Sequence, residues 1–322
     1  MDHNAGLGHP ESPERLQAVL DGIDGAGLDD VLVRVEARPA EREELERVHP
    51  YGYLDALARL SERGGGDIDP DTRASAGSWD AAVLAAGAGL DAVERLRREE
   101  ATAAFCAVRP PGHHATAKRP MGFCLVNGAA VVAAALADAG ERVLVLDWDA
   151  HHGNGTQDAF YADGRVAYVS THQSPLYPGS GDLDETGSED GAGTTLNLPF
   201  PPGTTGDVYL AAFDEVIGPF AEDFGPTWVV VSSGFDAHRS DPLTNLGLSS
   251  GDFATFTKRA MSLAPEGRLV AILEGGYDLD ALSGSAAACV AAMAGADHEA
   301  EPPTSGGPGR DVVEEAKRRR RG

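Results

Sequence analysis

The chain contains 322 residues with a formal net charge of −25, which excludes a globally basic surface for nucleic acid. No run of roughly 18 apolar residues is present, so we expect no membrane span, and residues 1–8 lack the basic and apolar segments of a secretory signal. Cys106, Cys124 and Cys289 are too few and too scattered for a disulfide framework, which favours a cytoplasmic location.

The basic side chains are almost all arginine, since lysine occurs only as Lys118, Lys258 and Lys317. Excess carboxylate with scarce lysine suits a protein that stays soluble in concentrated salt, where the Debye length falls to about 3 Å at 1 M. We therefore expect a halophilic host, with an ordinary acidic bacterial protein as the alternative. Unfolding on dilution into low salt supports the first, and full stability without salt supports the second.

Short apolar segments alternate with helical segments along the chain. The expected strands are, in chain order, 103–108, 142–147, 166–170, 195–198, 227–232 and 268–273. The expected helices are 122–139, 207–221 and 251–264. The strongest strands are continuous apolar runs, as in parallel sheets covered on both faces, and the alternation predicts an α/β fold.

Two long segments rich in Gly, Asp, Pro and Ser, 61–80 and 172–206, are expected to be functional loops, because loops of this length are uncommon in compact domains. We expect one domain over residues 1–297, since no linker divides it. Residues 298–322 are predicted to be a disordered charged tail. Its basic end either contacts nucleic acid or balances the acidic body, and we favour the second.

Polar side chains follow four of the expected strands, at the ends where parallel sheets bind ligands. These segments are Arg109-Pro-Pro-Gly-His113-His114, Asp147-Trp-Asp149-Ala-His151-His152-Gly-Asn154, Ser233-Gly-Phe-Asp236-Ala-His238 and Glu274-Gly-Gly-Tyr277. Singly, each has a structural explanation, such as a helix cap at Asp147 or a tight turn at Gly275-Gly276. Together, at four strand ends, they favour the site of a metal hydrolase.

Asp149, His151 and Asp236 can offer two oxygens and one nitrogen to a divalent cation. Three protein ligands leave a position open for water, which is typical of catalytic zinc, whereas structural zinc more often uses cysteine. Affinity order alone does not decide between zinc, ferrous iron and cobalt in the cell.

Hydrolysis also needs a proton acceptor for the water, a proton donor for the leaving amine and a group that stabilises the oxyanion. His113 or His114 can transfer the protons, and Tyr277 can donate a hydrogen bond to the oxyanion.

Seven motifs occur in a specific order: His9-Pro-Glu-Ser-Pro-Glu-Arg15, Arg109-Pro-Pro-Gly-His-His-Ala115, Gly122-Phe-Cys-Leu-Val-Asn127, Asp147-Trp-Asp-Ala-His-His-Gly-Asn-Gly-Thr156, Tyr177-Pro-Gly-Ser-Gly181, Gly234-Phe-Asp-Ala-His-Arg-Ser-Asp-Pro242 and Glu274-Gly-Gly-Tyr277. Over residues 8–296 the chain resembles the histone deacetylases and their bacterial and archaeal relatives, including acetoin-utilisation proteins and acetylpolyamine amidohydrolases. Asn154 and Glu274 are similar to the class II branch. The resemblance implies an arginase-like three-layer α/β sandwich, with a mostly parallel eight-stranded sheet flanked by helices.

The resemblance also implies catalytic roles. Asp149, His151 and Asp236 would bind zinc. His114 would be the general base and acid with Asn154 as its partner, and His113, tuned by Asp147, would lie beside the metal-bound water. Tyr277 would stabilise the oxyanion.

The resemblance further implies substrate contacts and a second ion. Phe123 and Tyr177 would form the walls of a narrow tunnel for an alkyl-amine stem, and Gly122 would accept a hydrogen bond from the substrate amide. Arg15 would line an internal exit for acetate. Ser170, with backbone oxygens of Asp147, Asp149 and His151, would hold a structural potassium ion.

Three features depart from the family pattern. Relatives usually have an apolar strand before the His9 motif, so either the start of the sequence is misassigned or the sheet lacks a strand. Tyr177 stands where Phe is usual. A substrate-holding Asp is expected near residues 67–70 but aligns with no single residue.

The implied activity is a zinc-dependent amidohydrolase that releases acetate from N-acetylated lysine of proteins or small molecules. Leu243 is apolar where polyamine-selective relatives can place an acidic residue, which favours lysine over acetylpolyamine, although the overall acidity would also attract polyamines. A non-catalytic acetyl-lysine binding module is disfavoured because the catalytic residues are intact. A dinuclear manganese ureohydrolase would need an Asp-x-His-x-Asp pattern, which is absent. A nucleotide-binding sheet would need a Gly-rich phosphate loop directly after a strand, and none of the expected strands is followed by one.

Overall fold

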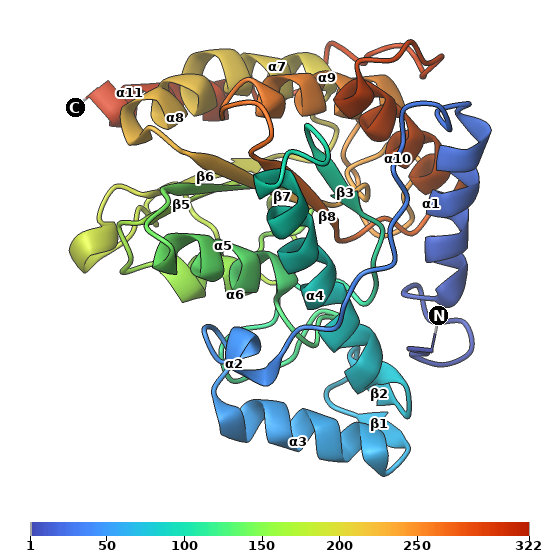
Figure 1. The fold of residues 1–322 in the computed structure, drawn as a ribbon. Coiled ribbons are helices and arrows are strands. Elements are labelled where there is room, and N and C mark those ends of the chain that lie inside the picture. The colour runs from blue at the N-terminus through green and yellow to red at the C-terminus, as the bar shows by residue number, and fades with distance from the viewer. Residues whose placement is uncertain (1, 322) are drawn as a thin grey trace.

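The computed structural model describes residues 2–321, and its centre is a six-stranded sheet between two layers of helices (Figure 1). The strands are β3 (Ala104–Cys106), β4 (Val143–Asp147), β5 (Val166–Gln173), β6 (Thr195–Phe200), β7 (Trp228–Ser233) and β8 (Leu269–Leu273). Their order is β3-β8-β7-β4-β5-β6, and all neighbours pair in parallel. The six predicted strands are therefore the six strands of this sheet.

Helices cover both faces of the sheet (Figure 1). One layer contains α1 (Pro13–Gly25), α7 (Gly206–Ala212), the π-helical turn η2 (Phe213–Ile217), α8 (Gly218–Phe224), α9 (Ser250–Met261), α10 (Leu279–Ala294) and α11 (Arg310–Arg321). The other contains α2 (Arg42–Leu45), α3 (Tyr51–Glu62), α4 (Ser78–Arg97), α5 (Gly128–Asp138) and α6 (Asn154–Phe160). A short hairpin, β1 (Gly65–Asp67) and β2 (Arg73–Ser75), and a 3-10 turn, η1 (Glu189–Gly191), lie outside the layers. None of the helices in residues 2–321 is long and apolar enough to cross a membrane.

The apolar runs of the strands supply both cores. In β4, Val143 and Val145 belong to the core under α4 and α5, whereas Leu144 and Leu146 belong to the core under α9 and α10. Side chains alternate between the faces of a strand, so a strand covered on both sides needs apolar residues at every position.

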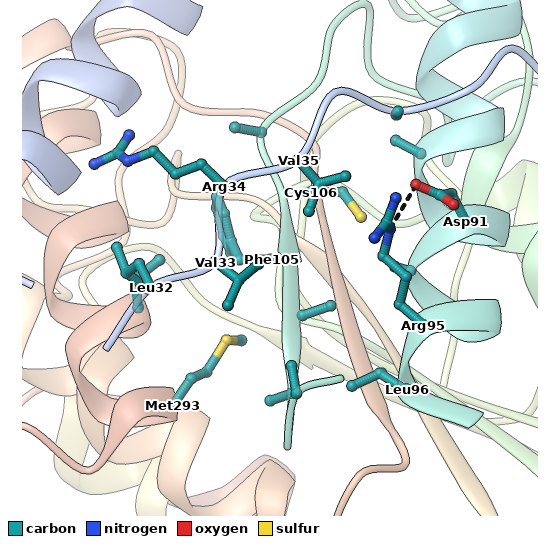
Figure 2. Close-up of a pocket in the computed structure, with 18 of the residues that line it drawn as sticks. Leu32, Val33, Arg34, Val35, Asp91, Arg95, Leu96, Phe105, Cys106 and Met293 are labelled. Carbon is teal, nitrogen blue, oxygen red and sulfur yellow. Dashed lines mark hydrogen bonds and ion pairs between the residues drawn. The ribbon is translucent and has the colours of Figure 1, made fainter. Parts of the chain in front are cut away.

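The central sheet has six strands in the described residues, so the expectation of eight is wrong. β3 is an edge strand, and it lines a cavity of about 650 Å³ together with residues of the segment 31–37 (Figure 2). Val31, Val33 and Val35 of that segment are exposed although they are apolar. In the described residues this segment pairs with no strand, so it does not extend the sheet.

The C-terminal segment, expected to be a disordered tail, ends in a helix in this structure. Residues 299–309 cross the outer surface of the molecule, and α11 packs against α7 and β6 with Val313 and Ala316 buried. The basic side chains of α11 pair with acidic residues of the body: Lys317 with Glu215, Arg319 with Asp184 and Arg320 with Asp223. These ion pairs agree with the proposal that the basic end balances the acidic body.

We expect Val313→Ala to lower the free energy of unfolding by about 2 kcal/mol, because it removes two buried methyl groups and leaves a cavity. Val33→Ala is the control, since Val33 is 70% exposed and its truncation should cost less than about 0.5 kcal/mol. Urea denaturation of both variants measures the difference. Equal effects would show that α11 does not contribute to the core.

Candidate active site

The four segments that contain the expected metal ligands, histidines and tyrosine follow strands that are neighbours in the sheet. β3 leads to His113 and His114, β8 to Tyr277, β7 to Asp236 and β4 to Asp149. Parallel strands end on one side, so the order β3-β8-β7-β4 brings the segments together.

Asp149, His151 and Asp236 form a compact group whose ligand atoms all lie within 4.8 Å of one another. His151 Nδ1 lies 2.8 Å from Asp236 Oδ2 and 3.2 Å from Asp149 Oδ1. Burial and the charge of Asp149 raise the pKa of Asp236 to about 7, because two carboxylates in one buried site repel each other. A divalent cation relieves this repulsion, and two carboxylate oxygens with one imidazole suit catalytic zinc.

Two glycines allow the carboxylates to approach the backbone. A Cβ at Gly234 would lie 2.1 Å from Asp149 Oδ2, and one at Gly275 would lie 2.5 Å from oxygens of both Asp149 and Asp236. Gly275 N donates to Asp149 Oδ2 over 2.8 Å, and Ala150 N donates to Asp236 Oδ1 over 2.7 Å. His151 N also donates to Asp149 Oδ1 over 2.9 Å, so the backbone fixes both oxygens of Asp149 and one oxygen of Asp236.

Each of the two adjacent histidines has its own partner. His114 Nδ1 lies 2.8 Å from Asn154 Oδ1, which only accepts, so Nδ1 carries the proton and Nε2 is left as an acceptor. His113 Nδ1 lies 3.0 Å from Asp147 Oδ2. The rings are 4.1 Å apart between centroids.

The surroundings separate the pKa values of these histidines. Burial opposes protonation of His113, but the charges of Asp149 and Asp147 outweigh it and raise its pKa well above the ordinary value. Burial of His114, with the charges of His113 and His151, lowers its pKa well below the ordinary value. One imidazole is therefore suited to hold a proton and the other to accept one.

Tyr277 is held by contacts with Asp241 and Arg15. Its backbone N donates to Asp241 Oδ2 over 2.7 Å, and the guanidinium of Arg15 lies 4.8 Å from its ring centroid. Arg15 is fully buried and donates to the carbonyl oxygens of Gly276 and Glu274. Burial raises the pKa of Tyr277 well above the ordinary value, so the phenol keeps its proton and can donate.

Aromatic rings border this centre. The Phe123 ring lies 5.7 Å from the Tyr277 ring and the Tyr177 ring 5.1 Å from His114, both edge-on. A Cβ at Gly122 would lie 2.4 Å from the His114 ring and 3.0 Å from Tyr177, and Gly122 has a φ of 56°. Phe123 itself has a φ of 67°, a conformation that costs a non-glycine residue about 1 kcal/mol or more and is concentrated at functional sites.

Leu243 and Ser170 lie at the margins of the site. Leu243 is half-buried, and its N donates over 2.9 Å to Asp241, the residue that also binds Tyr277 N. Ser170 pairs with Asp147 across β4 and β5, but its hydroxyl contacts His172 Nδ1 at 2.9 Å. Carbonyl and hydroxyl oxygens beside Asp147 are suitable ligands for a hard cation.

Sequence reasoning gave no role to several residues that position the site. Glu274 Oε2 accepts from the backbone N of Gly112 and His113, and Asp241 binds the backbone of Tyr277. Both residues stand inside the recognised motifs, but spacing alone does not reveal their partners. Thr72, in the loop expected to be functional, accepts from Phe123 N over 3.1 Å.

A buried charge cluster joins the N-terminal motif to the site. Glu11 is fully buried, forms a two-bond pair with Arg109 at 2.7 Å per bond, and lies 3.2 Å from Arg15. Burial opposes ionisation of Glu11, but His3, Arg15 and Arg109 outweigh it and lower its pKa to about 2. Arg15, the residue beneath Tyr277, therefore depends on Glu11 for its counter-charge.

The chain is similar to known proteins in both sequence and fold. The model of the histone deacetylase domain matches residues 9–293. A probable deacetylase of Archaeoglobus fulgidus is 41% identical over 92% of this chain and 84% of its own length, and a histone deacetylase-like amidohydrolase of Pseudomonas aeruginosa is 41% identical over 85% and 73%. The crystal structure of the HDA15 HD domain superposes with a TM-score of 0.90 at 36% identity, over 98% of this chain and 89% of that one. With the metal-ligand group, the two histidines and the phenol at four neighbouring strand ends, these matches show that the chain belongs to the histone deacetylase family.

Proposed function

We propose that the chain is a zinc-dependent amidohydrolase that releases acetate from N-acetylated lysine side chains of proteins or small molecules. The observation that carries the proposal is the convergence of Asp149, His151 and Asp236 beside the adjacent rings of His113 and His114. The relatives' names, deacetylase and amidohydrolase, support the same class of reaction.

Asp149, His151 and Asp236 would hold the zinc ion. When bound, zinc lowers the pKa of a water and polarises the carbonyl of the substrate amide. The buried carboxylates and their backbone hydrogen bonds keep the ligand geometry fixed before the ion arrives.

Protons move through His114 in this proposal. Its Nε2 is free to accept the proton of the attacking water, while Asn154 holds Nδ1 and so fixes the ring. The same nitrogen then returns the proton to the leaving amine. His113, whose Nδ1 is paired with Asp147, would lie beside the water, and the Tyr277 hydroxyl would donate to the oxyanion of the tetrahedral intermediate.

The aromatic border supports a substrate with a thin aliphatic stem. Phe123 and Tyr177 would contact the methylene groups of an acetylated lysine, each worth about 0.8 kcal/mol when buried. Gly122 would accept from the substrate amide, and Leu243 would add an apolar contact at the rim. Arg15, buried beneath Tyr277, would guide acetate to an internal exit.

Potassium is the second ion we propose. Ser170 and the backbone oxygens around Asp147 would hold it, and its effect would be structural. The strand pairing of β4 with β5 places Ser170 opposite Asp147, which supports the site.

An acetylpolyamine is the second candidate substrate, because the net charge of −25 would attract a polycation. The test measures acetate release from an acetyl-lysine peptide and from N-acetylspermidine, with and without a chelator and after zinc is restored. We expect zinc-dependent release that is faster with the peptide. Faster release from acetylspermidine would make the polyamine the substrate, and no zinc-dependent release from either would overturn the proposed function.

A further inference from the structure

The C-terminal segment crosses the loop that carries a metal ligand. Residues 301–304, which we name the strap, contact residues 234–249, the loop between β7 and α9, and the start of α9 itself. Asp236 lies in this loop. The strap lies beyond residues 9–293, the part matched by the family model.

Glu301 makes the central contacts of the strap. Its Oε2 lies 2.6 Å from His238 Nε2 and accepts from Ser250 N over 3.1 Å, and its Oε1 pairs with Arg239. Its own N donates to Ser250 Oγ over 3.0 Å. One carboxylate thus binds two consecutive residues of the loop and the first residue of α9.

The hydrogen bond between His238 and Glu301 needs no charged imidazole. Ser240 N donates to His238 Nδ1 over 3.2 Å, so Nδ1 carries the lone pair and Nε2 carries the proton. His238 is nearly fully buried, and its Nε2 points at Glu301. Partial burial opposes ionisation of Glu301, but the hydrogen bonds from His238 and Ser250 outweigh it and lower its pKa to about 2.

The same loop positions two groups of the site. Asp236 is a metal ligand, and its carbonyl oxygen accepts from Thr244 within the loop. Asp241, three residues after His238, accepts from Tyr277 N over 2.7 Å. In the sequence, His238 and Arg239 therefore lie between Asp236 and Asp241, the residue that binds the backbone of Tyr277.

A second set of contacts anchors the strap to the start of α9 and does not involve Asp236. Thr304 Oγ1 donates to Asp252 Oδ2 over 2.7 Å, and Ser249 Oγ donates to the Pro302 carbonyl over 2.9 Å. A Cβ at Gly251 would lie 2.1 Å from the Glu301 carbonyl oxygen, so the strap lies directly on α9. Glu301 is therefore fixed to a helix at the end of the loop it binds.

We infer that Glu301 is a positioning residue of the metal site, which acts through His238 and Arg239 to hold the Asp236 loop where Asp236 can share the cation with Asp149 and His151. This inference rests on the proposed function. Groups outside the ligand set that orient metal ligands typically change metal affinity about 10- to 100-fold. The strap thus couples the C-terminal segment to metal affinity.

The test measures the zinc dissociation constant by chelator competition, with the absorption spectrum of the cobalt-substituted protein as a second readout. We expect Glu301→Ala to raise the dissociation constant about tenfold and to lower kcat with KM unchanged. Glu301→Gln keeps acceptors for His238 and Ser250 and should stay within about threefold of the parent. Thr304→Val is the matched control: it removes the hydroxyl bond to Asp252 and keeps the bonds from the backbone N of residue 304, so it should lower stability and leave the dissociation constant within about twofold.

Arg239→Ala provides a milder variant, because Arg239 is about half exposed and its loss is compatible with folding. It removes one partner of Glu301, and we expect a rise of about threefold in the zinc dissociation constant. The inference is overturned if Glu301→Ala has the same zinc dissociation constant as the parent; if Glu301→Ala does not fold, Arg239→Ala takes its place in this comparison. It is also overturned if Thr304→Val raises the dissociation constant as much as Glu301→Ala does. A parent chain that binds no zinc would instead overturn the proposed function.

Discussion

Tyr277→Phe is expected to lower kcat on an acetyl-lysine peptide about 100- to 1000-fold, because it removes the hydroxyl that we propose donates to the oxyanion. Phenylalanine keeps the ring that Arg15 and Phe123 contact, so the fold and the zinc affinity should not change. Steady-state kinetics and the zinc dissociation constant, measured on one preparation, separate the loss of chemistry from the loss of metal.

Tyr177→Phe is the matched control for this substitution. It also removes a phenol hydroxyl beside the site, but Tyr177 contacts His114 with its ring edge and serves as a wall. We expect its kcat to stay within about threefold of the parent. If Tyr277→Phe retained turnover as well as Tyr177→Phe does, the oxyanion role would be refuted.

Glu11→Gln is expected to lower the free energy of unfolding by about 3 to 5 kcal/mol, because removal of one partner leaves buried charge without compensation. Arg15 and Arg109 would keep their positive charges next to a neutral amide. Glu100→Gln is the control, since Glu100 pairs with Arg95 and Arg98 at the surface, where an ion pair contributes less than about 1 kcal/mol. Urea denaturation at neutral pH measures both, and similar values would contradict the role of Glu11.

The lowered pKa of Glu11 also predicts how the stability of the fold depends on pH. The pKa of Glu11 falls from 4.5 in the unfolded chain to about 2 in the folded protein, which corresponds to about 3 kcal/mol. A lowered pKa stabilises the fold above pH 4.5, and this contribution is lost as pH falls from 4.5 towards 2. The parent should therefore lose more stability over this window than Glu11→Gln, and parallel pH profiles would contradict the assignment.

The sequence predicted the sheet and the site better than it predicted the edges of the molecule. All six strands were expected, because a strand covered on both faces is a continuous apolar run, as in Val143–Asp147. The helix expected over 122–139 begins only at Gly128, since Asn127 caps it through Ala130 N and residues 122–127 adopt turns that shape the site. The motif residues lie close together because the carboxyl ends of parallel strands all lie at the same edge of the sheet.

Long-range partners could not be read from the sequence. The contact of Glu301 with His238 joins residues 63 positions apart, and nothing in the composition of the tail indicates it. The order of α11 depends on acidic residues such as Glu215 that lie far away in the chain. Composition therefore suggested disorder where ion pairs and two buried apolar side chains produce a packed helix.

We propose that two carboxylates and one imidazole, those of Asp149, Asp236 and His151, share a single ion. Equilibrium zinc titration of the parent and of Asp149→Asn tests it most directly, because the amide keeps the shape of the side chain and removes the charge of one ligand. We predict one tightly bound zinc per chain for the parent and an affinity at least about 100-fold lower for the variant. Equal zinc binding by both chains would contradict the account.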